Sequence, residues 1–259
     1  MNLPGDGMDA GALRQLRFSE LEEARVLQRY LLPDGAMRTG SVEFVSRFQP
    51  VAEVGGDFLD YFWLSDRRVG IYVGDVVGKG LAAAMYAALT VGTLRGIHKT
   101  GIPPTQVLAL LNRRLRTRAM PGRFSAVQYA VYDPGSRELF YANAGLPRPI
   151  HITANGCAEV GEGGLPSGLF DDARYDEHIV RLAPGDAVLF TTDGLMEAHN
   201  AARDEFGVER VIQVCSQNHS GPPDLLLDRL FESLLEFTGG SAPHDDMTAA
   251  LLKTYLESV

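Results

Sequence analysis

The sequence contains little cysteine, no long hydrophobic run and no excess of positive charge. Its two cysteines, Cys157 and Cys215, are far apart and lack the spacing of metal ligands. No uninterrupted apolar run approaches the roughly 18 residues that a transmembrane helix needs. The formal net charge is −9, whereas general binding to nucleic acid requires a basic surface. These absences argue against a membrane protein and against a nucleic-acid partner.

The start of the chain lacks a secretion signal, because residues 1–11 contain no basic stretch followed by an apolar segment. We therefore expect a cytoplasmic protein. A length of 259 residues does not require two domains. We expect a flexible segment at residues 1–17, a regulatory or linker helix within residues 18–39 and one folded domain at residues 40–256.

Residues 18–32 are rich in helix formers, and Pro33 is expected to end this helix. An apolar stripe runs along it from Phe18 to Leu31. The stripe is too short for the three or four heptads of a coiled coil. We expect a helix that docks on a partner or forms a homodimer.

Runs of β-branched and aromatic residues, separated by turn residues, predict strands along most of the remaining chain. These runs lie at residues 41–49, 57–63, 69–73, 126–132, 138–142, 149–152, 178–182, 186–191 and 247–255. We expect a buried helix at residues 81–94, others at 103–118 and after Pro222, and a long loop at 156–172. This order is typical of an α+β fold in which sheets pack together and helices lie outside.

Four short acidic motifs stand where predicted strands begin or end. They are Gly55–Phe58, Gly74–Gly80, Thr192–Gly194 and Asp245–Thr248. Each motif alone is also a common turn sequence, so the argument depends on all four together. Carboxylates gathered in a low-dielectric site must take up protons or be compensated by cations. If the fold gathers these motifs, they form a metal site.

The residue types in the motifs indicate which metal and which reaction. Carboxylate and carbonyl oxygens, with no thiolate or paired imidazole nearby, favour magnesium or manganese over zinc or copper. Two such ions about 3.5 to 4 Å apart could acidify a water molecule and clamp a phosphoryl group for attack. The motifs therefore predict hydrolysis of a phosphate ester.

Several other residues admit a functional and a structural interpretation. Lys79 follows a glycine-rich turn and either contacts substrate or only begins a helix. His199 and His244 lie near the acidic motifs and either transfer protons or are solvated. The arginines between residues 113 and 123 either dock a partner or form a solvated helix face. Trp63 is expected in the core.

Taken together, the motifs resemble those of the metal-dependent (PPM, type 2C) serine/threonine phosphatases, in their bacterial SpoIIE/RsbU branch. Further matching segments extend the resemblance to roughly residues 27–253. They are residues 28–33, 141–145, 164–168, 184–186 and 206–207. The resemblance implies a four-layer α/β/β/α fold with a central antiparallel β-sandwich flanked by helices, and a centre of two Mn²⁺ or Mg²⁺ ions that activates the attacking water.

The resemblance also implies the ligands of this centre. Asp75 would bridge both metals, and the carbonyl of Val76 would add a backbone ligand. Asp57 would hold one metal, and Asp193 and Asp245 would complete the other side. Asp246 is a further candidate ligand. The sequence departs from the family pattern at Val77, where serine is common, and at Leu146, where histidine often stands.

The family further implies a substrate and a mode of control. The substrate would be a phosphorylated STAS-domain anti-sigma-factor antagonist in a partner-switching pathway of the stress or sporulation kind, and an upstream sensor or activator would act through the N-terminal helix. Two other classes stay open. One is a phosphatase-like module that binds a partner without hydrolysis. The other is a nucleotide cyclase, which the Gly55–Phe58 motif suggests but the three later motifs disfavour.

Overall fold

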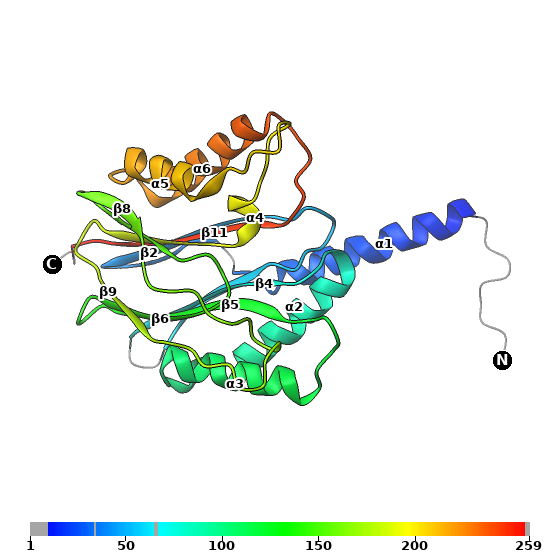
Figure 1. Ribbon diagram of the computed structural model, residues 1–259, viewed down its shortest axis with the longest axis horizontal. Coiled ribbons are helices and arrows are strands. Elements are labelled where there is room, and N and C mark those ends of the chain that lie inside the picture. Colours follow the sequence, from blue (N-terminus) through cyan, green and yellow to red (C-terminus); the bar gives the residue numbers. More distant parts are fainter. Residues whose placement is uncertain (1–9, 34, 65–66, 257–259) are drawn as a thin grey trace.

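Two antiparallel sheets packed face to face form the centre of the molecule (Figure 1). The computed structural model describes residues 10–33, 35–64 and 67–256. The first sheet has the strand order β1-β2-β11-β10-β7-β8. Its strands are β1 (Met37–Thr39), β2 (Val42–Gln49), β7 (Ile150–Thr153), β8 (Gly156–Glu159), β10 (Ala187–Thr191) and β11 (Met247–Thr254). The second sheet has the order β3-β4-β5-β6-β9. Its strands are β3 (Phe58–Trp63), β4 (Val69–Val76), β5 (Ser125–Asp133), β6 (Glu138–Ala144) and β9 (His178–Arg181).

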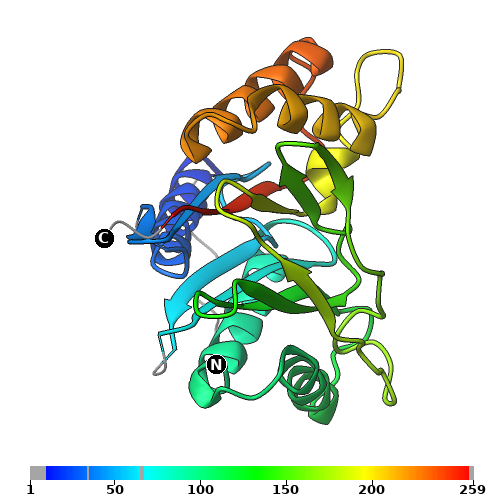
Figure 2. The same ribbon diagram turned by 90° about the vertical axis from the view of Figure 1, so that its left-hand side faces the viewer.

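A pair of helices covers the outer face of each sheet, on opposite sides of the sandwich (Figure 2). The helices α2 (Gly80–Arg95) and α3 (Pro104–Thr117) pack on the second sheet. The helices α5 (Gly207–Asn218) and α6 (Pro223–Thr238) pack on the first. Short helices η1 (His98–Thr100) and α4 (Asp193–Met196) complete the domain. The predicted α+β fold with helices outside a β-sandwich is confirmed.

The strand sequences account for this layering. In β4, Ile71 and Val73 pack between the sheets, whereas Tyr72 packs against the helices. In β11, Leu252 faces the other sheet and Leu251 faces α5 and α6. Successive side chains of a strand point to opposite faces. Because both faces of these strands are covered, their sequences are continuously apolar.

The helix α1 (Ala10–Arg29) extends away from the sandwich (Figure 1). It begins at Ala10, so residues 10–17, expected to be a flexible segment, are helical, and residues 1–9 lie outside the described residues. Only the end of α1 and the turn after it reach the body, where Gln28 is buried and Leu31 packs on the core. Leu27 and Tyr30 are 68% and 78% exposed.

Other expectations differ from the structure in detail. Residues 156–159, expected in a loop, form β8, which pairs with β7. The helix α5 is not among the predicted elements. On α2, expected to be a buried helix, Met85 and Leu89 are exposed because alanines on the opposite face contact the sheet. Trp63 is 45% exposed at the end of β3, and not in the core.

Among the described residues, no helix has both the length and the apolar character needed to cross a membrane.

Candidate metal centre

The fold brings the four acidic motifs into contact at one end of the sandwich. A Cβ atom added to Gly56 would lie 2.7 Å from the carbonyl oxygen of Val76 and 3.1 Å from Oδ1 of Asp75. A Cβ added to Gly194 would lie 3.0 Å from the Cβ of Asp245. Glycine at these positions therefore permits close approach between motifs that are up to 190 residues apart in sequence.

Asp57, immediately before β3, is buried and tied to the other sheet. Its Oδ2 accepts hydrogen bonds from the Oγ1 atoms of Thr192, at 2.7 Å, and Thr248, at 2.6 Å. Burial, followed by the charge of Asp75, raises the pKa of the Asp57 carboxyl well above its usual range, and the two hydroxyls oppose that shift. Asp57 thus joins the two sheets and carries a proton readily when no cation is present.

Asp75 and Asp193 extend this row of carboxylates. Burial and then repulsion by Asp193 raise the pKa of Asp75, which lies within β4, to about 7. Asp193 begins α4, and burial and then the charge of Asp245 raise its pKa. The amide N–H of Gly194 stabilises the ionised form of Asp193. Each aspartate therefore interacts electrostatically with the next, from Asp57 to Asp245.

Asp245 is the most accessible member of the row. Its side chain is 36% exposed, and Oδ2 lies 3.2 Å from Nζ of Lys79. Lys79 immediately precedes α2, and its side chain makes no capping hydrogen bond. The lysine thus provides a positive charge at the edge of an otherwise acidic site.

Asp246 is held differently from the other four aspartates. It is buried, its Oδ1 accepts the backbone N–H of Val51 at 2.8 Å, and its Oδ2 accepts that of Gly56 at 2.6 Å. Both oxygens thus fix the loop that leads to Asp57. This arrangement favours a positioning role, and the role of Asp246 as a metal ligand stays a prediction.

The donor set fits hard divalent cations. Among residues 10–33, 35–64 and 67–256, no three histidine, cysteine, aspartate or glutamate side chains form a ready-made site for one ion. The aspartates instead form a row of repelling neighbours, beside which lies the carbonyl of Val76. Oxygen donors favour Mg²⁺ or Mn²⁺, and ions between the carboxylates would remove their repulsion.

Two histidines stack beside the centre. The ring centroids of His199 and His244 lie 4.3 Å apart. Burial, followed by the neighbouring His199, lowers the pKa of His244. Nε2 of His199 lies 3.0 Å from the guanidinium of Arg203. Each ring therefore has a partner, which the sequence did not reveal.

The two departures from the family pattern lie in different surroundings. Leu146 is buried between the sheets, and its backbone N–H donates to Oδ1 of Asn143. Val77 lies next to the Asp75–Val76 motif, and its carbonyl accepts a hydrogen bond at 2.6 Å from Arg123. In this chain the position of Leu146 therefore serves the core.

Sequence reasoning missed the residues that support the aspartates. Thr192 and Thr248 belong to the motifs, but their shared bond to Asp57 requires two strands of the first sheet to be neighbours. Gln28 of α1 donates to the carbonyl of Gly55 at 2.7 Å and accepts the N–H of Gly55 at 3.1 Å. Only the position of α1 in the fold reveals this contact.

A family model described as Stage II sporulation protein E (SpoIIE) matches residues 65–255. The chain belongs to the SpoIIE family. Among its relatives in this family, phosphoserine phosphatase RsbU of Bacillus subtilis (strain 168) is 26% identical over 242 residues, which cover 91% of this chain and 70% of RsbU.

Two further comparisons extend the SpoIIE-family assignment. Protein IcfG of Synechocystis is 24% identical over 257 residues, covering 88% of this chain, and the chain spans only 40% of IcfG. The SiaA-PP2C domain of Pseudomonas aeruginosa has a TM-score of 0.83 at 20% identity, covering 95% of this chain and 99% of that domain. This likeness shows that the SpoIIE-family chain has the fold of a PP2C domain.

Proposed function

We propose that the protein is an Mn²⁺- or Mg²⁺-dependent protein phosphatase that hydrolyses phosphoserine or phosphothreonine on a partner protein. The observation that carries this proposal is the row of aspartates, contributed by both sheets of a SpoIIE-family fold and buried beyond what ionised carboxylates tolerate without cations. The similarity to RsbU, named as a phosphoserine phosphatase, supports the same reaction class.

We assign the metal ligands from the same row. Asp57, Asp75 and the carbonyl of Val76 would hold one ion, and Asp193 and Asp245, with Asp75 shared, would hold the other. Two bound divalent ions would supply Lewis-acid chemistry that lowers the pKa of water and neutralises charge on a phosphoryl group. Without these ions, the carboxylates repel an incoming phosphate.

The residues around the aspartates orient and charge them. The two threonine hydroxyls hold Asp57 in one orientation and favour its ionised form, which is the form that binds cations. Lys79 holds Asp245 at the accessible edge of the site. Its ammonium group is a positive charge at the edge of the site that an anionic phosphoprotein could contact.

We further propose the partners that the family resemblance implies. The substrate would be a phosphorylated STAS-domain anti-sigma-factor antagonist in a stress or sporulation pathway in the cytoplasm. An upstream sensor or activator, or a second copy of the chain, would contact α1. The exposed apolar side chains Leu16, Leu27 and Tyr30 on and just after α1 support a contact of this kind.

The alternative of a partner-binding module without hydrolysis is less well supported. A module of that kind has no use for buried, mutually repelling carboxylates, which destabilise the fold when no cation is bound. Membership of the SpoIIE family and the PP2C fold also disfavour the nucleotide cyclase that the Gly55–Phe58 motif suggests.

A phosphatase assay tests the proposal. The chain is incubated with p-nitrophenyl phosphate and with a phosphoserine STAS protein, with Mn²⁺ or with EDTA. We expect activity with Mn²⁺ only, and a loss of about 1,000-fold in Asp57→Asn and in Asp193→Asn, because each removes a ligand of ions that stabilise the transition state by several kcal/mol. Asp176→Asn, at an exposed position, is the control and should retain full activity. Activity in EDTA, or full activity in both ligand variants, would refute the mechanism.

A further inference from the structure

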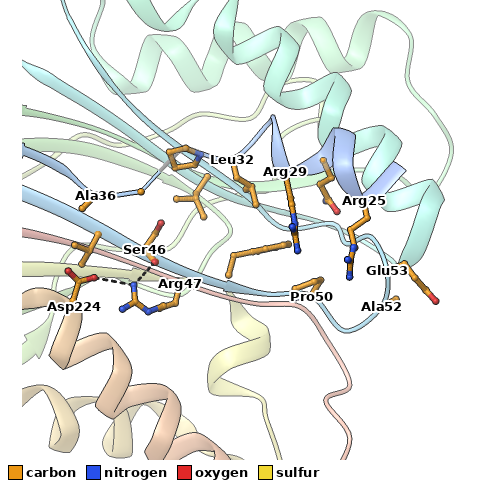
Figure 3. A pocket seen from close by; sticks show the side chains of 16 residues that line it. Arg25, Arg29, Leu32, Ala36, Ser46, Arg47, Pro50, Ala52, Glu53 and Asp224 are labelled. Carbon is orange, nitrogen blue, oxygen red and sulfur yellow. Dashed lines mark hydrogen bonds and ion pairs between the residues drawn. The ribbon is translucent and has the colours of Figure 1, made fainter. Parts of the chain in front are cut away.

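A cavity of about 730 Å³ separates the end of α1 from β2 (Figure 3). Its walls are the second half of α1, the residues Leu32, Pro33, Gly35 and Ala36, the strand β2 and the loop from Pro50 to Glu53. None of the aspartates of the metal centre lines it. The volume falls within the range of about 300 to 1,000 Å³ that is typical of small-molecule sites.

One side of the cavity is apolar. Val45 and Leu59 are buried at its base, and Phe48 and Leu32 are partly buried around it. Pro50 extends this apolar surface. Such a lining suits a hydrocarbon or aromatic group of a ligand, because contact with it removes apolar surface from water.

The side facing α1 is positively charged. The side chains of Arg25 and Arg29 point from α1 into the cavity (Figure 3). Nη2 of Arg25 lies 3.3 Å from Glu22, but its Nε is buried and has no hydrogen-bond partner. The side chain of Arg29 is exposed and makes no hydrogen bond or ion pair within the described part of the chain. A buried N–H group without an acceptor is unfavourable, so Nε of Arg25 is a donor that an anion could use.

The third arginine of the cavity, Arg47, already donates its hydrogen bonds to groups of the protein. The guanidinium of Arg47 donates to Asp228 at 2.7 Å, to Asp224 at 3.2 Å and to the carbonyl of Ser46 at 3.0 Å. Glu53 lies beside Arg25 (Figure 3), and Asp224, which is bonded to Arg47, lies at the opposite end of the cavity. Both carboxylates would repel a second negative group, so the arrangement suits a ligand with a single anionic group that lies between Arg25 and Arg29.

We propose that this cavity binds a small organic anion. Its carboxylate, sulfonate or phosphate group would accept hydrogen bonds from Arg25 and Arg29, and its apolar body would contact Leu32 and Phe48. Gln28 lies between the two arginines on α1 and is bonded to Gly55, two residues before Asp57. A ligand in the cavity would therefore influence the position of Asp57 in the metal centre. This second effect rests on the proposed phosphatase function.

Fluorescence titration of the full chain tests the site. The probe is 8-anilinonaphthalene-1-sulfonate, an aromatic body with one sulfonate, and its neutral analogue is N-phenyl-1-naphthylamine. We expect saturable binding of the sulfonate, a Kd at least about 10-fold higher for the neutral analogue, and a Kd at least about 10-fold higher in Arg25→Gln/Arg29→Gln, because the sulfonate then loses its charge-assisted hydrogen bonds. The control, Arg14→Gln/Arg17→Gln, removes the same charge from an exposed part of α1 and should bind as the parent does.

A second variant keeps both arginines and fills the space instead. Ala36→Trp should also weaken binding of the sulfonate, with the circular dichroism of the chain unchanged. Equal affinity for both probes, or equal effects of the two arginine pairs, would overturn the site, because the sulfonate would then be adsorbing to exposed apolar surface. Arginine-dependent binding in a chain that shows no phosphatase activity with Mn²⁺ would preserve the site and reject the proposed function.

Discussion

The two pairs of aspartates in the candidate metal centre differ in how the protein holds them. Asp57 and Asp75 belong to the second sheet, and burial raises the pKa of both. Asp193 and Asp245 flank strands of the first sheet, and Asp245 is partly exposed and paired with Lys79. Burial also raises the pKa of Asp193, so Asp245 is the accessible member of the second pair.

Aspartates contribute to a metal site both by holding cations and by leaving space for substrate. Asp57 and Asp75 are held in place before any cation binds, and their burial lowers the stability of the metal-free protein. Asp245, which is partly exposed, leaves room for water and for a phosphoryl group. All four aspartates should matter for activity, but Asp245 should matter least for the stability of the metal-free protein.

The largest expected effect is on the stability of the metal-free protein and its dependence on pH. The pKa of Asp75 is about 7 in the folded protein and about 3.9 in an unfolded chain. The folded state therefore binds more protons than the unfolded state between about pH 4 and 7, so the free energy of unfolding falls as the pH rises through that window. At pH 8 in EDTA, we expect Asp75→Asn to be more stable than the parent by roughly 2 to 4 kcal/mol.

Urea denaturation in EDTA between pH 4.5 and 8 measures this effect. Asp245→Asn, at the partly exposed aspartate, is the matched control and should change the free energy of unfolding by less than about 0.5 kcal/mol. A parent protein whose stability rises from pH 5 to 8, or equal stabilisation by both variants, would show that the two pairs are not held differently.

A smaller effect is expected from the hydroxyls that hold Asp57. Thr248→Val removes the 2.6 Å bond to Oδ2 of Asp57 while preserving shape. We expect Mn²⁺ affinity to fall about 10- to 100-fold, as is usual when a group that orients a metal ligand is lost. Thr254→Val, in the same strand but bonded to the carbonyl of Ala183, is the control. Equal Mn²⁺ affinities of these variants in a calorimetric titration would contradict the role of Thr248.

The smallest expected effect concerns α1. Gln28→Ala breaks both hydrogen bonds to Gly55, which leaves the loop before Asp57 less restrained. We expect the Mn²⁺ concentration for half-maximal phosphatase activity to rise about 5- to 10-fold, corresponding to roughly 1 to 1.4 kcal/mol. Gln15→Ala, on the exposed part of α1, should leave it unchanged. An unchanged Mn²⁺ requirement in Gln28→Ala would show that α1 does not influence metal binding.

The layered fold and the meeting of the motifs could be anticipated from local patterns. Continuous apolar runs, such as those of β4 and β11, and glycine beside aspartate at strand ends are properties of short segments. The apolar character of α2 is also visible in the sequence, but periodicity does not say which face is covered. The buried face includes Tyr86, Val91 and Leu94, whereas Met85 and Leu89 are exposed.

The remaining features depend on contacts between distant segments. Gln28 is an ordinary helix residue until α1 is placed beside Gly55. The two oxygens of Asp246 are used by the backbone of residues about 190 positions away, which no local pattern encodes. The helix α5 escaped prediction because it begins at a glycine with a φ of 73° and has no side-chain cap.

Electron paramagnetic resonance of the chain titrated with Mn²⁺ tests the central claim most directly, because it counts the ions and reports whether they are neighbours. We predict two ions per chain with the spectrum of a spin-coupled pair, and loss of the coupling in Asp75→Asn, the proposed bridging ligand. A parent chain that binds no Mn²⁺ at millimolar concentration, or that binds one isolated ion, would contradict the account.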